Sequence, residues 1–98
     1  MGCQVIFSPR AVHDLETIVR YISAHNAPAG LTFGEALVRR VETLAAFPES
    51  GRIVPEMANP AIREVFHGRY RIVYRLRPTK NVVEVLRFWH AAQGEPQI

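Results

Sequence analysis

The feature that most constrains the fold is residues 70–77, where apolar and basic side chains alternate. One side carries Tyr70, Ile72, Tyr74 and Leu76, and the other carries Arg71, Val73, Arg75 and Arg77. Alternation of this kind, with aromatic and β-branched residues, is typical of a strand that is buried on one side only. The sequence therefore predicts a sheet whose apolar side rests on a core and whose arginine side faces water or an anionic partner.

Two helical segments precede this strand and are expected to supply the core. Ser8 and Pro9 are suited to begin the first helix, because a Ser side chain caps free backbone N–H groups and Pro fits the first turn. A second helix begins at Pro28 and is terminated by Pro48. The two apolar stripes are Val12, Leu15, Val19 and Ile22, and Phe33, Leu37, Val41 and Leu44. We expect a helical hairpin whose stripes face a common layer.

Short apolar runs predict the other strands. These are residues 3–7, 62–67 and 82–89, whereas residues 48–61 lack periodicity and predict a loop, and residues 94–98 predict a loose tail. The expected element order is β-α-α-β-β-β. Hydrophobic residues make up 48% of the chain and charged residues 21%, which is a globular composition. We expect one α+β domain over residues 1–98.

The register of the last hairpin decides which residues share a face. One candidate register, here called even, would place Arg75 opposite Glu84. It would also place Arg87 among Tyr70 and Ile72 on the apolar face, where a charge is unfavourable. We therefore prefer an odd register with a bulge or a three-residue turn, which places Glu84 on the core side. The odd register groups Val82, Leu86 and Phe88 with Tyr70, Ile72 and Leu76 on one face, and Arg71, Arg75, Arg87 and Trp89 on the other.

Charge and cysteine usage restrict the partners and the chemistry. Residues 1–51 carry a net charge of −1 and residues 52–90 a net charge of +5, so the second half is the expected contact for an acidic or phosphate-bearing partner. The single cysteine, Cys3, excludes an internal disulfide. No His pair has ligand spacing, and no apolar run could span a membrane. We expect a cytoplasmic protein without metal or cofactor.

Several motifs resemble those of a known family. They are residues 7–11 (FSPRA), 47–52 (FPESGR), 62–64 (IRE), 70–74 (YRIVY) and 86–90 (LRFWH). In this order they resemble the RelE/ParE superfamily of toxins from type II toxin–antitoxin modules, and most of all its ParE-like branch. The resemblance implies a mostly antiparallel four-stranded sheet with the helical hairpin on one face. It also implies a growth-arresting, plasmid-stabilising toxin.

The resemblance also implies a partner: a small, acidic-tailed, DNA-binding antitoxin that forms a hetero-oligomer with the toxin. Antitoxins of this class use an amphipathic helix and an extended segment. Gly30 and Gly34 lie on one face of the second helix, which would let the first helix or a partner approach closely. We take the Gly30/Gly34 face and the neighbouring groove between hairpin and sheet as the candidate antitoxin surface.

The target has three readings. A ParE-like toxin would act on DNA gyrase without chemistry of its own, and we prefer this reading because residues 48–61 contain no Lys and Ala91, Ala92 and Gln93 stand where many relatives carry Arg. A RelE-like ribosome-dependent ribonuclease would use Arg71 on the phosphate and His90 as acid or base, assisted by Arg63, Glu49 and Glu64. The third reading is an inactive or purely binding member. The candidate target or nucleic-acid contacts are Arg63, Arg69, Arg75, Arg87 and Trp89.

Overall fold

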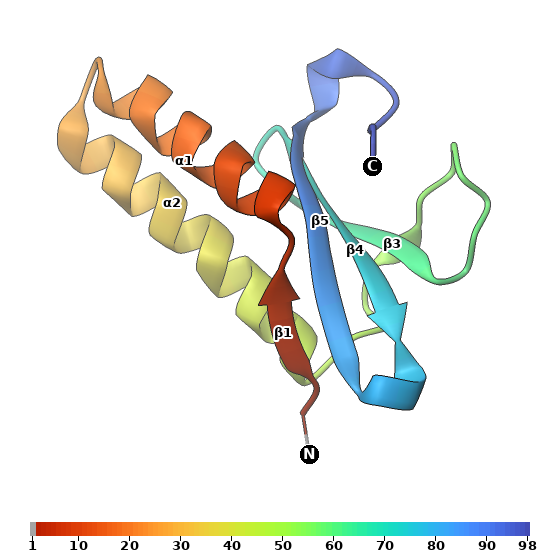
Figure 1. The fold of residues 1–98 in the computed structure, drawn as a ribbon. Helices are drawn as coiled ribbons and strands as arrows, with labels where there is room; N and C mark the ends of the chain where they lie inside the picture. Colours follow the sequence, from red (N-terminus) through yellow and green to blue (C-terminus); the bar gives the residue numbers. More distant parts are fainter. Residues whose placement is uncertain (1) are drawn as a thin grey trace.

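The computed structural model describes residues 2–98, which form a helical hairpin packed on one face of a twisted sheet (Figure 1). The elements are β1 (Gln4–Phe7), α1 (Pro9–Ser23), α2 (Ala27–Glu42), η1 (Thr43–Ala45), β2 (Arg52–Ile53), β3 (Ile62–His67), β4 (Tyr70–Arg77), η2 (Pro78–Lys80), β5 (Val82–His90) and η3 (Ala91–Gln93). The strand order is β1-β5-β4-β3-β2. Strand β1 runs parallel to β5, and the other neighbours are antiparallel.

The predicted order is confirmed, with one strand added. The four expected strands are β1, β3, β4 and β5, and the sheet gains β2 at its edge. Strand β2 pairs only Arg52 with Glu64 and Ile53 with Arg63. Two residues are too few to show alternation, so β2 falls within the predicted loop of residues 48–61.

Side-chain caps begin both helices. The Ser8 hydroxyl accepts a hydrogen bond from Ala11 N at 3.1 Å, as expected from the Ser-Pro pair. Asn26 does the same for α2, because its Oδ1 accepts from Ala29 N at 3.1 Å. Helix α2 therefore starts at Ala27, one residue before Pro28, and it ends at Glu42 because η1 takes the chain toward Pro48. None of the helices within residues 2–98 combines the length and apolar character needed to cross a membrane.

The main core lies between the hairpin and the sheet. Its buried members from the sheet are Val65, Ile72, Tyr74, Val83, Val85 and Phe88, and those from the helical side are Ala11, Ile18, Leu37, Val41 and Leu44. Leu15 and Ile22 of the expected α1 stripe pack against the core, but Val12 is 42% exposed while the flanking residues Ala11 and Ile18 are buried. Both buried residues flank the stripe, so the amphipathic period was right and only its centre differed.

The β4–β5 hairpin combines both candidate registers. Tyr70 pairs with His90 and Ile72 with Phe88, but past a bulge after Val73 the register changes and Arg75 pairs with Glu84. The bulge keeps Phe88 on the core side and also turns Val83 and Val85 inward. The expectation that Val82, Leu86 and Glu84 face the core was therefore wrong. Glu84 instead accepts hydrogen bonds from Arg77, at 2.9 and 3.1 Å.

The face of the sheet opposite the helices is not open. A second apolar cluster of Val54, Ile62 and Val73 is packed there, with Met57 and Leu86 at its border. The segment after β2 covers this cluster, and the C-terminal segment lies close by, where Pro96 is buried. The expected loose tail is tied down, since Gln97 O accepts from Arg87 at 2.7 Å and Ile98 O accepts from Arg10 at 3.2 Å.

Candidate functional site

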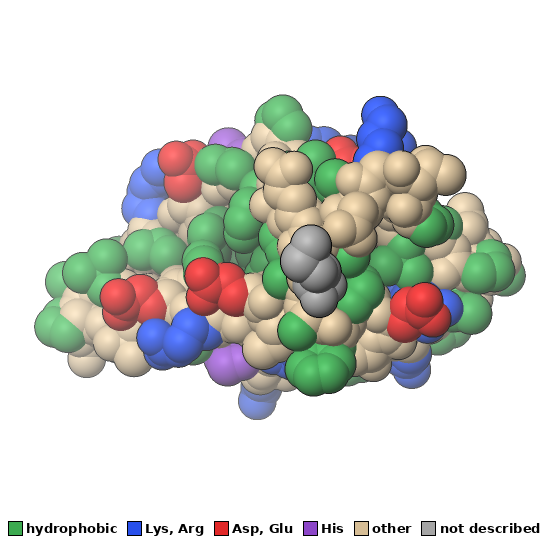
Figure 2. Space-filling view, turned by 90° about the horizontal axis from the view of Figure 1, so that it is seen from below, with side chains coloured by type: hydrophobic (Ala, Val, Ile, Leu, Met, Phe, Trp, Pro, Cys, Tyr) green, Lys and Arg blue, Asp and Glu red, His purple; other side chains and the backbone are tan. Residues whose placement is uncertain are grey.

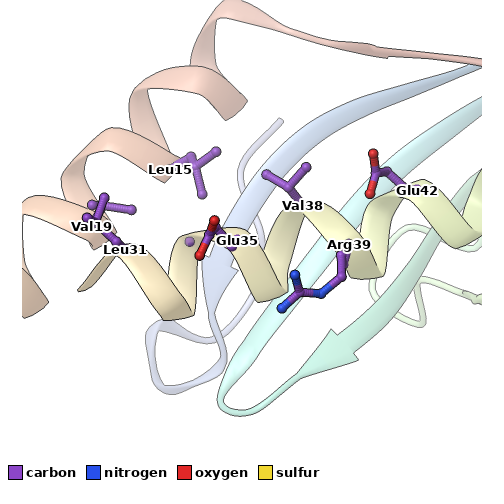
Figure 3. A pocket seen from close by; sticks show the side chains of 8 residues that line it. Leu15, Val19, Leu31, Glu35, Val38, Arg39 and Glu42 are labelled. Atoms are coloured by element: carbon purple, nitrogen blue, oxygen red, sulfur yellow. The ribbon is translucent and has the colours of Figure 1, made fainter. Parts of the chain in front are cut away.

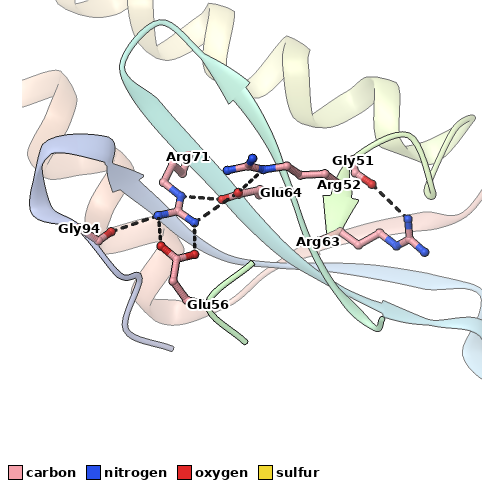
Figure 4. A network of polar contacts seen from close by, with 7 residues as sticks. All are labelled: Gly51, Arg52, Glu56, Arg63, Glu64, Arg71 and Gly94. Atoms are coloured by element: carbon pink, nitrogen blue, oxygen red, sulfur yellow. Dashed lines mark hydrogen bonds and ion pairs between the residues drawn. The ribbon is translucent and has the colours of Figure 1, made fainter. Parts of the chain in front are cut away.

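Arg71, the predicted phosphate-binding residue, lies at the centre of a closed ionic network (Figure 4). Its Nε donates to Glu64 Oε1 at 2.6 Å, and its two terminal nitrogens donate to the two oxygens of Glu56 at 2.9 and 2.7 Å. A further bond of 3.1 Å reaches Gly94 O in the C-terminal segment. The Arg71 residue is only 6% exposed. The expectation that this arginine faces water or a partner was therefore wrong.

Two carboxylates neutralise Arg71, and each sits in a different environment. Glu64 is 1% exposed and also accepts from Arg52 Nε at 2.7 Å, so it lies between two guanidinium groups. Glu56 belongs to the surface segment after β2, and its hydrogen bonds with Arg71 hold its pKa at about 2. The same bonds raise the pKa of Arg71 above its ordinary value. Arg71 thus has no free hydrogen-bonding direction for a substrate phosphate while Glu56 is in place.

His90, the second predicted catalytic residue, lies on the other face of the sheet. The register pairs Tyr70 with His90 and Arg71 with Trp89, and neighbouring residues of a strand point to opposite faces. The His90 ring packs edge-on against Tyr70 on the helix side, with ring centres 5.0 Å apart. Arg71 and His90 therefore cannot act together on one phosphate in this fold.

A groove, here called the β5 groove, lies between α1 and the end of β5, and residues from both faces of β5 line it. Its volume is about 680 Å³. The lining residues are His13, Asp14, Thr17, Ile18, Tyr21, Tyr70, Arg87, Phe88, Trp89, His90 and Gln93. Three residues singled out in the sequence, Arg87, Trp89 and His90, thus share this groove. Arg71 does not line it.

Arg87 is held in place within the β5 groove. Its Nε and Nη2 donate to the carboxylate of Asp14 at 2.7 and 2.9 Å, which raises the Arg87 pKa. The guanidinium also lies over the Trp89 ring, 4.9 Å from its centre. Asp14 in addition accepts from Phe88 N at 3.1 Å, so this carboxylate joins α1 to β5 where β1 has ended.

The remaining predicted contacts are dispersed. Arg63 donates to Gly51 O at 3.1 Å and thereby holds the segment before β2 (Figure 4). Arg75 is half-buried in the sheet, between Ile62 and Glu84, and Arg69 is exposed at the β3–β4 turn. Glu49, the expected assistant, is exposed and contacts Arg63 only through its backbone oxygen at 3.4 Å. The structure does not bring these side chains to one site.

Gly30 and Gly34 serve the contact between the two helices. A Cβ atom at Gly30 would lie 2.8 Å from Val19 O, and one at Gly34 would lie 2.7 Å from a methyl group of Val19. The glycines could admit either the first helix or a partner, and the structure shows that helix α1 packs against them. Both glycines thus serve the contact with α1, and Gly34 also borders a groove on the hairpin.

That groove, here called the hairpin groove, has a volume of about 400 Å³ (Figure 3). Apolar side chains form its floor, and charged side chains stand along α2. The lining residues are Leu15, Val19, Leu31, Gly34, Glu35, Val38, Arg39 and Glu42. On the face seen from below, hydrophobic side chains lie among acidic and basic ones along the hairpin (Figure 2). Leu31 is 64% exposed and contributes an apolar side chain to this groove.

Two residues that organise the site escaped sequence reasoning. Glu56 lies in a proline-rich loop, and nothing local indicates that it reaches Arg71. Asp14 is one of two carboxylates in α1, and no local signal separates it from Glu16. Both act across the fold, 15 and 73 positions away from their partners. Within residues 2–98, no group of three His, Cys, Asp or Glu side chains is placed to hold a metal ion.

Comparison with known proteins identifies the family. The family model described as "ParE toxin of type II toxin-antitoxin system, parDE" matches residues 5–94. The chain belongs to this family. The match covers both helices, strands β2 to β5 and all of β1 except Gln4. The resemblance to the RelE/ParE superfamily is thereby confirmed.

Solved structures show the same fold. A chain of the chromosomal ParDE toxin–antitoxin system from P. aeruginosa superposes with a TM-score of 0.74 at 17% identity, covering 91% of this chain and 96% of that chain. A chain of the toxin–antitoxin complex RelBE2 from Mycobacterium tuberculosis gives a TM-score of 0.68 at 24% identity, covering 92% and 99%. None of the curated proteins matches this ParE-family chain.

Proposed function

We propose that this ParE-family toxin arrests growth by binding DNA gyrase and not by cleaving RNA. Cleavage of RNA through its own 2′-OH requires an acid, a base and a cation around one phosphate. The observation that supports a binding mechanism is the separation of Arg71 from His90. They occupy opposite faces of the sheet, and Glu56 and Glu64 already neutralise Arg71.

Opening the network around Arg71 would not create a ribonuclease site. Glu64 stays buried beside Arg71 even if Glu56 moves away, so an incoming phosphate would meet a carboxylate as well as a guanidinium. Like charges at this distance repel strongly when they are shielded from water. Residues 48–61 supply no lysine that could compensate. These features favour a toxin whose surface, and not a catalytic centre, acts on the target.

The test of this function is a pair of assays on the purified toxin. With gyrase and supercoiled plasmid, we expect double-strand breaks that accumulate with toxin concentration and require gyrase. With ribosomes and mRNA, primer extension should show no new ends. Ribosome-dependent cuts that vanish in His90→Ala would overturn the proposal. Inactivity of a folded toxin in both assays would instead identify an inactive or purely binding member.

We further propose that the hairpin groove binds the cognate antitoxin through an amphipathic helix. The groove presents an apolar floor with Glu35, Arg39 and Glu42 along it, which suits a helix with one apolar face. The two solved structures described above come from toxin–antitoxin assemblies, which supports an antitoxin partner for this chain. The antitoxin would be the small protein encoded beside the toxin.

The antitoxin contact predicts a specific loss of affinity. Leu31→Asp places a charge on the apolar floor and should weaken antitoxin binding at least tenfold in titration calorimetry, because that charge would be desolvated in the complex. Val12→Asp is the matched control, since Val12 is also exposed but does not line the groove. Equal affinity of both variants would place the antitoxin elsewhere.

A further inference from the structure

One stripe of α2 alternates apolar and acidic side chains along the hairpin groove. Four residues that line the groove follow each other at spacings of four, three and four: Leu31, Glu35, Val38 and Glu42. Such spacings place side chains on one face of a helix. Figure 3 shows Val38 and Glu42 on the side of α2 that faces Leu15, whereas Arg39 extends the other way. The two glutamates thus stand among the apolar residues of the groove.

Neither glutamate is neutralised inside the free chain. Both are exposed, and no ion pair within residues 2–98 includes Glu35 or Glu42. Arg39 follows Glu35 by four residues and precedes Glu42 by three, yet it pairs with neither within the described part of the chain. The hairpin groove therefore presents two unpaired negative charges beside its apolar side chains.

A helix that covers the apolar residues of this stripe also covers the two carboxylates. Because the residues alternate, a helix lying on Leu31 and Val38 takes Glu35 and Glu42 out of water. Burial of a carboxylate is unfavourable unless an opposite charge lies at hydrogen-bonding distance. The occupant of the groove must therefore bring one cation for each glutamate.

This requirement argues against two other occupants. Phosphate groups of a nucleic acid would meet two carboxylates and no paired cation. A second copy of this chain, packed through the same surface about a two-fold axis, would bring its own Glu35 and Glu42 into the interface. Like charges that face each other across an interface lower the affinity. A basic, amphipathic helix of another protein suits the groove better than either.

We propose that the hairpin groove selects an antitoxin helix that carries two basic residues seven positions apart, one for Glu35 and one for Glu42. Seven residues of a helix rise about 10 Å, both on α2 and on its partner, so the two pairs match for a parallel or an antiparallel helix. The inference rests on the proposed function, in which the antitoxin fills this groove. It adds the charges by which the toxin distinguishes its own antitoxin from others.

Charge reversal in the toxin tests the two contacts separately. Glu35→Lys and Glu42→Lys should each weaken binding of the antitoxin encoded beside the toxin by about tenfold in titration calorimetry, because each leaves a basic residue facing a lysine. Glu49→Lys is the matched control, since Glu49 is exposed and lies outside the groove. It changes the net charge equally and should leave the affinity close to that of the parent chain.

Charge reversal in the antitoxin identifies the partners. When the basic residues of its helix are changed to Glu one at a time, one change should restore the affinity of Glu35→Lys. A different change, seven positions away, should restore that of Glu42→Lys.

The outcomes separate this inference from the antitoxin site on which it rests. Glutamate variants that behave like Glu49→Lys, or restoring residues at any other spacing, would overturn the inference. A loss of affinity in Leu31→Asp would then show that the antitoxin site itself still holds. An unchanged affinity for Leu31→Asp would overturn both.

Discussion

Glu64 is a charged side chain in the interior of a small protein, and two guanidinium groups make this possible. Burial of an isolated carboxylate is prohibitively unfavourable, so it requires opposite charge at hydrogen-bonding distance. Arg71 supplies it from inside the sheet and Arg52 from the surface, at 2.6 and 2.7 Å. Arg71 is thus part of the structure and not a free contact residue.

The ion pair between Glu56 and Arg71 predicts a dependence of stability on pH. The pKa of Glu56 is about 2 in the folded chain, below its ordinary value of 4.5. The charged form therefore stabilises the fold above the ordinary value, and this contribution is lost as the pH falls from about 4.5 toward 2. We expect the urea midpoint of Glu56→Gln to lie below that of the parent chain at pH 7 and to approach it near pH 2.

The control for this titration is Glu16→Gln, which removes an exposed carboxylate that forms no ion pair among residues 2–98. Its midpoint should stay close to that of the parent chain at every pH. A difference between Glu56→Gln and the parent that does not change with pH would contradict the assignment of the ion pair.

Tyr74 joins the FPESGR segment to the core through its hydroxyl. The hydroxyl donates to Pro48 O at 2.8 Å and accepts from Gly51 N at 3.0 Å. Tyr74→Phe leaves both backbone groups without a partner in a buried place. We expect a loss of about 1–3 kcal/mol in the free energy of unfolding, measured by urea denaturation. Tyr21→Phe, at an exposed ring, should change it by less than about 0.5 kcal/mol.

Helix α2 contains two residues of low helix propensity, and its contact with α1 explains them. Gly30 and Gly34 weaken α2 as an isolated helix, but they let α1 approach. At Gly30 an added Cβ would overlap Ser23 Oγ and would lie 2.8 Å from Val19 O. The Ser23 side chain can turn away, whereas the backbone oxygen can move only with the helix. The tight helix contact thus rests on the missing side chain.

Gly30→Ala should therefore destabilise the chain, although alanine favours a helix by up to about 1 kcal/mol relative to glycine. Overpacking of a tight contact costs typically about 1–3 kcal/mol, which exceeds that gain. Thermal unfolding followed by circular dichroism should show a lower midpoint for Gly30→Ala, and Ser23→Ala in the same chain should restore only part of it. A midpoint above that of the parent chain would mean that α1 can move away from α2 at little cost, which would contradict the tight contact.

What the sequence could and could not predict follows the range of the interactions. Some features depend on neighbours in the chain: the start of the helix at Ser8, the alternation of β4 and the element order. The predictions of these features are correct. Other features depend on residues that only folding brings together, and they were not predicted. These are the bulge after Val73, the pairing of Glu56 with Arg71 and the bonded C-terminal segment. The side chains of β4 were assigned correctly to two faces, but the second face was taken as open because its cover is irregular and leaves no periodic signal.

On the scale of the whole molecule, irregular segments cover parts of the sheet that the helices leave uncovered. The hairpin covers one face of the sheet, and the segment after β2 closes part of the other with Val54 and Met57. Gly94 accepts from both Arg71 and Trp89, so the C-terminal segment joins the ionic network to the wall of the β5 groove. The hairpin groove and the β5 groove, both bordered by helix residues, are open to partners.

Variants of Arg71 and Glu64 can separate a structural role of Arg71 from a catalytic one. Arg71→Met alone leaves Glu64 buried without its inner partner and should cost about 3–5 kcal/mol, enough to abolish growth inhibition by unfolding the toxin. Arg71→Met combined with Glu64→Leu replaces the buried pair by apolar side chains of similar volume and should recover most of that loss. Glu56 and Arg52 can both remain solvated, since they lie at the surface.

If the toxin acts as a binding protein, the double variant should also recover growth inhibition, whereas a ribonuclease that needs Arg71 would stay inactive. The measurement is colony formation after induction without antitoxin, together with the thermal midpoint of the purified variants. A double variant that is as stable as the parent chain but harmless would show that the Arg71 guanidinium or the Glu64 carboxylate itself contributes to toxicity. Recovery of stability and toxicity together would establish that Arg71 stabilises the surface that acts on the target.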